Sequence, residues 1–156
     1  MISLMLQDFL VEDELPELFE GFTLKNVEGN QTPVNIYSQY LPITSEDTDH
    51  FPFIKVILID GKEENEDSAD LVHLSFTAGV YDNSKNKQGY RDSVNIINRI
   101  YTDIKGKKIL DKRYILEYPV KWIINNDDTY PYFYTTIETY WSVAKMEISN
   151  KDLYLE

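Results

Sequence analysis

Two short segments hold the residue types from which a metal or catalytic site could be built. His50 follows Asp47 and Asp49 in an acidic stretch. A second acidic loop, residues 60–70, contains Asp60, Glu63, Glu64, Glu66, Asp67 and Asp70. Carboxylates and imidazoles bind divalent cations, so a magnesium-dependent nuclease is the enzyme to consider. Two-metal sites usually gather carboxylates from separate rigid elements. Because these carboxylates crowd single loops, solvated acidic loops are the favoured interpretation.

Other catalytic arrangements are missing from the sequence. It has no cysteine, which excludes disulfides, zinc–thiolate sites and thiol catalysis. It has no glycine-rich phosphate loop, nucleophile elbow or His-Glu-x-x-His motif. His73 lies on the more polar face of a predicted strand, where a lone histidine usually has a structural role. The residues by themselves therefore give no clear catalytic or metal site.

The charge of the chain is strongly negative and unevenly distributed. The net charge of −12 argues against binding to nucleic acid through phosphate contacts, which needs a basic surface. Residues 1–70 hold 16 acidic and 3 basic side chains, whereas residues 71–156 are nearly neutral. One explanation is solubility alone. The alternative is a negative channel wall that lets DNA pass without holding it. Its candidate residues are the six of loop 60–70 together with Glu46, Asp47 and Asp49.

The elements that carry these loops fit one domain, because 156 residues with 42% apolar residues can bury a core. Residues 1–20 form a predicted helical extension, either one short helix or two helices broken near Pro16, and residues 22–145 form the core. No apolar run is long enough to cross a membrane, and no secretory signal is evident, so a cytoplasmic location is expected.

The periodicity within the core indicates strands and one strong helix. Strands are expected at 22–27 and 34–40, joined as a hairpin, and at 53–59 and 71–81. A helix is expected over 89–105 with Gly106 as its cap. Strands 114–124 and 132–143 form a second hairpin, and a short polar tail follows from Lys145. The fold class is therefore α+β, a mostly antiparallel sheet covered on one face by one main helix.

The tyrosines suggest a contact surface. The chain has 12 tyrosines, and Tyr132, Tyr134 and Tyr140 share the second face of the last strand. This face either meets another subunit or packs against the N-terminal helix as a second core. Pro119 interrupts a good strand, which is typical of an edge strand or a bulge. With Tyr118, these residues are the candidate subunit interface.

Three segments together resemble a known family. They are residues 51–61 (FPFIKVILIDG), residues 89–97 (GYRDSVNII), and residues 128–133 (DTYPYF) running into 138–141 (ETYW). In this order and spacing they resemble the tail terminator and tail-completion proteins of long-tailed phages and prophages. The resemblance covers residues 33–145. Pro52, Gly89 and Pro131 are read as turn and strand-boundary residues.

The resemblance implies a structural protein of the virion, without enzymatic activity and without a cofactor, present in the host cytoplasm during assembly. Such subunits form a ring, commonly a hexamer, on the last ring of the tail tube. The ring ends tube growth and provides the surface that docks to the head–tail connector protein, and DNA passes through it without specific binding. Its partners are further copies of itself, the tail tube protein and the connector. We expect one of the two acidic loops to face the channel, and loop 60–70 is the stronger candidate.

Three other functions remain open. Another neck protein, such as a head-completion stopper, has the same structural class but different partners. An acidic module that mimics DNA is a second alternative, although such mimics usually spread their charge along a helix or sheet face rather than in loops. The magnesium-dependent nuclease is the third.

Overall fold

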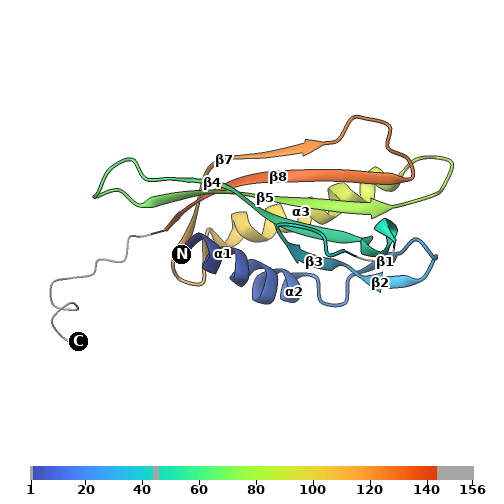
Figure 1. Ribbon diagram of the computed structural model, residues 1–156, viewed down its shortest axis with the longest axis horizontal. Coiled ribbons are helices and arrows are strands. Elements are labelled where there is room, and N and C mark those ends of the chain that lie inside the picture. Colours follow the sequence, from blue (N-terminus) through green and yellow to red (C-terminus); the bar gives the residue numbers. More distant parts are fainter. Residues whose placement is uncertain (1, 44–45, 144–156) are drawn as a thin grey trace.

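The computed structural model describes residues 2–43 and 46–143, except for the side chain of Asp47. The protein is an α+β domain with a curled mixed sheet, an N-terminal helix and one main helix (Figure 1). The predicted polar tail from Lys145 lies outside the described residues. Within the part of the chain that is described, no helix is long and apolar enough to cross a membrane.

The N-terminal segment is one helical rod of three parts. α1 (Ile2–Phe9) continues through a π-helical turn (Leu10–Glu14) into α2 (Leu15–Leu18). The wide turn directly precedes Pro16, the residue predicted to break the helix. Proline lacks an N–H and its ring crowds the preceding turn, and a wider turn accommodates both effects. Gly21, with φ +76°, follows the end of the helix.

The next strands differ from the predicted hairpin. β1 (Thr23–Lys25) pairs with β2 (Gln31–Pro33), and the strand that follows, β3 (Asn35–Ser38), pairs with another partner. The side chain of Asn26 accepts hydrogen bonds from the N–H groups of Glu28 and Asn30, which folds the chain back early. The predicted second strand, 34–40, therefore belongs to a different sheet from the first.

The main sheet has six strands in the order β3-β4-β5-β8-β7-β6. Its long members are β4 (Phe53–Lys62), β5 (Asp70–Tyr81), β7 (Tyr114–Ile124) and β8 (Tyr132–Val143), and β6 (Ile109–Leu110) is short. β3 is parallel to β4, and the other pairs are antiparallel. The predicted 114–124 and 132–143 hairpin is confirmed, as is the strand at 71–81. The predicted acidic loop 60–70 is shorter in the structure, because β4 runs to Lys62 and β5 begins at Asp70.

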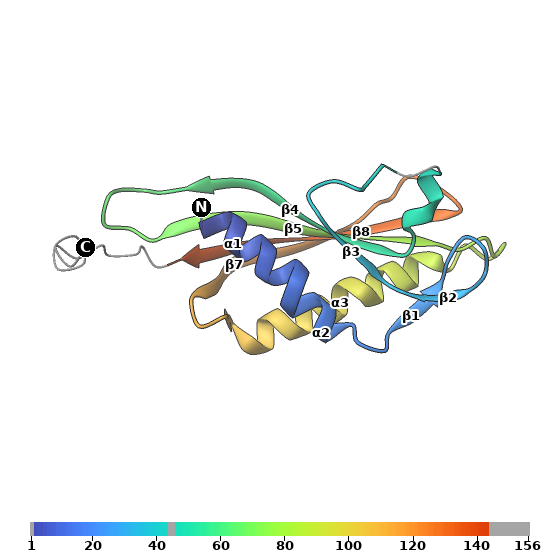
Figure 2. The same ribbon diagram turned by 60° about the horizontal axis from the view of Figure 1, so that its bottom comes forward.

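The core lies between one face of this sheet and the helices. α3 (Gly89–Lys107) buries Ile96, Ile97, Ile100 and Ile104 against the strands. The N-terminal rod adds Leu6, Leu10 and Leu15 to the same cluster. Figure 2 shows the rod beside α3, on the same side of the sheet. The alternative of a second core between this rod and the tyrosine face is therefore wrong.

Two local predictions had different outcomes. α3 passes through Gly106 and ends at Lys107, and Lys108, with φ +62°, takes the cap position that was expected for Gly106. Lys107 extends the helix because its ammonium bonds Asp103 one turn earlier and Glu14 of the N-terminal rod. An edge strand or a bulge was expected at Pro119, and the pairing of β7 with β8 shifts its register there, between Glu117 and Lys121. Pro52 and Pro131 directly precede β4 and β8, and Gly89 begins α3, as predicted.

Candidate interaction surface

The face of the sheet opposite α3, which we call the open face, has neither α3 nor the N-terminal rod over it, and among the described residues only the short 3-10 helix (Asp47–His50) lies beside one end of it. Strand pairing places the same-face side chains in rows across it. Phe53 of β4, Gly79 of β5 and Tyr134 of β8 form one row, and Lys55, Thr77 and Thr136 form the next. Most of these side chains are partly exposed, so this face is a surface that the fold leaves without a core of its own.

An aromatic cluster fills one end of the open face. The ring centroid of Phe51 lies 5.0 Å from that of Phe53, 4.9 Å from that of Tyr132 and 6.1 Å from that of Tyr134. The Phe53 ring lies directly over Gly79, where a Cβ atom would come within 2.2 Å of it. Gly79 is thus required because of this close approach. Burial raises the pKa of the Tyr134 hydroxyl, and neighbouring Tyr132 adds to the increase.

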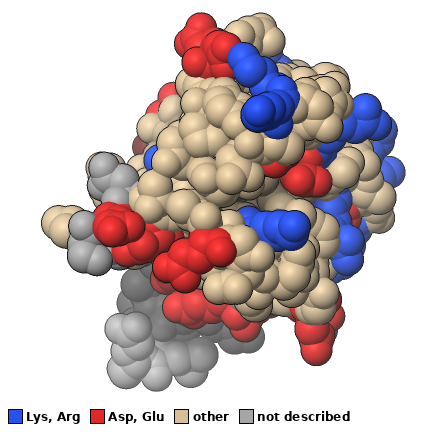
Figure 3. All heavy atoms as spheres, turned by 90° about the vertical axis from the view of Figure 1, so that its right-hand side faces the viewer, with Lys and Arg blue, Asp and Glu red and all other residues tan. Residues whose placement is uncertain are grey.

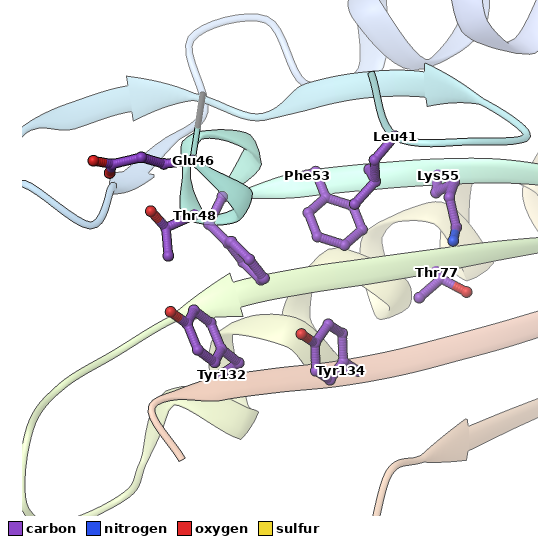
Figure 4. Close-up of a pocket in the computed structure, with 9 residues that line it drawn as sticks. Leu41, Glu46, Thr48, Phe53, Lys55, Thr77, Tyr132 and Tyr134 are labelled. Atoms are coloured by element: carbon purple, nitrogen blue, oxygen red, sulfur yellow. The ribbon is translucent and has the colours of Figure 1, made fainter. Parts of the chain in front are cut away.

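The cluster forms one wall of an open cavity of about 760 Å³. Figure 4 shows Phe53, Tyr132 and Tyr134 pointing into it from the sheet. Leu41, Glu46 and Thr48 line it from the segment before β4, and the Glu46 carboxylate points away from the rings. Lys55 and Thr77 border it along the strands. Apolar walls with a few polar groups at the margin suit insertion of an apolar side chain from a partner.

Polar side chains occupy the opposite end of the open face. The His73 ring stacks on Tyr140, with centroids 4.4 Å apart and planes 15° apart. Its Nδ1 lies 3.8 Å from the Asp60 carboxylate and its Nε2 lies 3.6 Å from Glu138. These distances exceed those of good hydrogen bonds, so stacking on Tyr140 is the contact that holds the imidazole. The structural role predicted for His73 agrees with this packing.

The predicted interface residues divide between two surfaces. Tyr132, Tyr134 and Tyr140 lie on the open face, in the cluster and beside His73. Tyr118 and Pro119 lie on β7 near the sheet edge, and Tyr118 is 62% exposed. The structure therefore does not join the five residues into one patch.

The sequence reasoning did not identify Phe51, Phe53 or Gly79 as parts of a surface. Phe53 was expected only as the first residue of the strand at 53–59. The only signal was the aromatic pair that flanks Pro52.

The two acidic loops lie at opposite ends of β4. Segment 43–50 precedes the strand and includes a short 3-10 helix (Asp47–His50), while 60–70 follows it. In Figure 1 the first is at the right end of the sheet and the second is at the left. Figure 3 views the right-hand end, where acidic side chains gather along the lower part and basic ones lie mainly to the right. The candidate channel residues therefore form two surfaces, of which Glu46 also borders the aromatic cavity and Asp49 is exposed.

The carboxylates do not converge on a metal site within the described ranges, where no group of three or more His, Asp or Glu side chains is placed to hold an ion. His50 is buried, with its ring 5.5 Å from that of Tyr37, and the Asp47 side chain lies outside the described atoms. Sequence comparison adds no family assignment: no protein-family model matches the chain, and no curated protein matches it significantly.

Proposed function

We propose that this protein is a structural subunit of a phage or prophage tail. Six copies form a ring on the last ring of the tail tube, end its growth and present the docking surface for the head–tail connector. The proposal starts from the resemblance of residues 33–145 to tail terminator proteins. In the proposed subunit, α3 covers one face of a largely antiparallel sheet, and the other face remains available to partners.

The observation that carries the proposal is that one small subunit has two separate sets of aromatic side chains outside its core, a largely buried cluster on the open face and an exposed set on the β7 edge. A terminator ring needs lateral contacts between its own copies and axial contacts with the tube and the connector. The open face has an aromatic cavity of about 760 Å³. The β7 edge exposes Tyr118, Trp122 and Ile123 by 62%, 56% and 42%. Large aromatic side chains that remain exposed in an otherwise acidic protein favour a subunit that works within an assembly.

In this proposal the protein is not an enzyme and needs no cofactor. DNA passes through the ring, and an acidic loop at the channel would repel the phosphates rather than hold them. If the strands run radially, only one of loops 43–50 and 60–70 can face the channel, because they lie at opposite ends of β4. The subunit would belong to the virion neck, with the host cytoplasm as its place of assembly.

The test is deletion of the gene from the phage or prophage that carries it, followed by electron microscopy of the particles. Overlong or headless tails are the expected result. Full heads that leak their DNA beside tails of normal length would instead identify a head-completion stopper, which is the second candidate. Normal particles would refute both.

A pair of matched variants then tests the surfaces. In complementation, Tyr118→Glu should fail to restore normal tails, because it places a charge on the exposed β7 edge. Tyr90→Glu is the control, since Tyr90 is also exposed but lies at the start of α3. Equal restoration by the two variants would remove the β7 edge from the proposal.

A further inference from the structure

The two edges of the main sheet are stepped, because at each edge the outermost strand covers only part of the strand beside it. β3 pairs with β4 only from Phe53 to Val56, and the Gln39 side chain then bonds the N–H and C=O of Leu58. From Ile59 to Lys62, no strand in the described part of the chain lies outside β4. At the other edge, β6 pairs with β7 only at Tyr114 and Ile115. The stretch of β7 from Tyr118 to Ile124 likewise has no outer strand among the described residues.

The uncovered part of each edge matches the position of the outermost strand at the other edge. Successive antiparallel pairings through β5 and β8 make β4 and β7 run in opposite directions. If a second copy lies beside the first as a continuation of the sheet, its uncovered part of β4 faces β6 of the first. Its β3 then faces the uncovered part of β7. This register brings Ile109 of β6, 51% exposed, toward Ile59 of β4, 44% exposed. Unpaired edges with exposed apolar side chains are the usual template for strand addition.

The charges at these edges are also complementary. Acidic loop 60–70 carries six carboxylates and one lysine. Residues 105–113, which we call the basic turn, carry five cationic side chains and one aspartate. The loop follows β4 and the turn precedes β7, so both lie at the same end of the sheet but on opposite edges (Figure 1). Side-by-side copies would therefore bring the basic turn of one near the acidic loop of the next.

The backbone of the basic turn supports a role for its lysines. Lys108 and Lys112 are exposed and have φ of +62° and +58°. Glycine or asparagine is the usual residue in this left-handed conformation, because a Cβ atom there crowds the backbone. Lysine at both positions keeps positive charge at a conformational cost, which is typical of side chains used in a contact.

We propose that copies of this chain associate edge to edge and head to tail. β6 and the basic turn of one copy contact the outer edge of β4 and acidic loop 60–70 of the next. The contact joins two different patches, as a closed ring requires. It rests on the ring of the proposed function, and it assigns loop 60–70 to the subunit contact, which leaves 43–50 for the channel.

Because the chain has no cysteine, engineered thiols can test the contact directly. A chain with Glu64→Cys and Lys112→Cys should give a ladder of covalent multimers with a short bis-maleimide at high protein concentration. A chain with Lys85→Cys and Lys112→Cys is the control, because Lys85 is exposed in the loop between β5 and α3. Monomer alone, or equal ladders from the two chains, would overturn the contact.

Charge reversal gives a second and independent test. Variant A carries Lys108→Glu and Lys112→Glu, and variant B carries Glu64→Lys and Asp67→Lys. Each alone should associate at least tenfold more weakly than the wild type in sedimentation velocity. A one-to-one mixture should form A–B dimers, seen in native mass spectra, because the basic turn of B and acidic loop 60–70 of A are both unchanged and make one wild-type contact. Lys25→Glu with Lys85→Glu changes the net charge as variant A does, but at the other end of the sheet, because Lys25 lies near Tyr81 and Asp82 and Lys85 follows the end of β5. This variant should have no effect.

The outcomes separate the contact from the proposed function. If variant A and its Lys25/Lys85 control associate equally, the contact is refuted. Lys108→Gly with Lys112→Gly removes the two charges, and glycine adopts the positive φ of both positions without strain. Weakened association of this folded variant supports the contact, and unchanged association contradicts it. Tail capping by variants A and B alike would overturn the contact and keep the terminator function. If association depends on the edge residues but deletion of the gene causes no tail defect, the contact is supported and the proposed function is refuted.

Discussion

The close approach of Phe53 to Gly79 gives a quantitative test of how the open face is built. We expect Gly79→Ala to destabilise the protein although alanine suits a strand better than glycine. A Cβ atom at residue 79 would lie 2.2 Å from Cε2 of Phe53. Carbon atoms in contact are normally about 3.5–4.0 Å apart, so the ring must move by about 1.5 Å.

The cost of this movement follows from what holds the ring. Phe53 is only 3% exposed and packs against Phe51 and Tyr134. Overpacking of a well-packed site costs about 1–3 kcal/mol, and each aromatic pair contributes about 0.5–1.5 kcal/mol beyond its buried area. Replacing glycine with alanine also lowers the conformational entropy of the unfolded chain, which offsets about 0.4–1 kcal/mol of this cost. We therefore expect the free energy of unfolding to fall by about 2 kcal/mol.

Urea denaturation followed by tryptophan fluorescence measures this change, since Trp141 is fully buried in the core. The midpoint should fall by about 1 M. Gly61→Ala is the matched control. Its Cβ atom would lie 3.6 Å from the carbonyl oxygen of Leu71, an ordinary contact, so its effect should be within about 0.5 kcal/mol.

A double-mutant cycle tests the stated cause. In a Phe53→Leu background the obstructing ring is gone, so Gly79→Ala should cost less than about 1 kcal/mol. The reasoning is refuted if the cost is the same in both backgrounds, or if Gly79→Ala is neutral in the wild type.

Three further predictions concern other parts of the fold. Burial and neighbouring Asp103 raise the pKa of Glu14 despite its bond to Lys107. The stability that this group provides is therefore full at low pH and is lost as pH rises through its folded pKa. In urea titrations between pH 4 and 8, the stability of Glu14→Gln relative to the wild type should increase with pH, and a constant difference would contradict this. Gln39→Ala should lower the free energy of unfolding by about 1–3 kcal/mol and speed amide hydrogen exchange at Leu58, whereas Ser38→Ala at an exposed neighbour should do neither. Lys108→Gly should leave stability unchanged or raise it by up to about 1 kcal/mol, because the cap position has φ +62°, and a thermal melt showing clear destabilisation would count against the strain we assign there.

The local periodicity of the sequence predicted the middle and end of the fold well. The alternation in 71–81, the helical stripe from residue 89 and the hairpin of 114–124 with 132–143 all correspond to observed elements. These segments are long, and each buries one face, so the pattern of apolar residues is sufficient to identify them. Pro119 also indicated its bulge, because proline has no N–H to donate to the ladder.

The first forty residues were less predictable because their strands are short. Three residues, as in β1 and β2, show no alternation, and the pairing partner of β3 is set by packing rather than by local pattern. The extension of α3 past Gly106 depends on Lys107 bonding to Glu14, which lies 93 positions away. No local signal in the chain reports such a contact.

The candidate surface shows the same division. The sequence by itself determined that thiol chemistry is excluded, that the negative charge lies in the first half, and that the tyrosines of β8 share one face, because composition and strand alternation are local properties. Tertiary structure alone decided that the N-terminal rod packs on the side of α3, that Phe53 lies over Gly79, and that the sheet edges are stepped with opposite charges. Each of these depends on which distant segments come together, and burial of the shared core sets that arrangement.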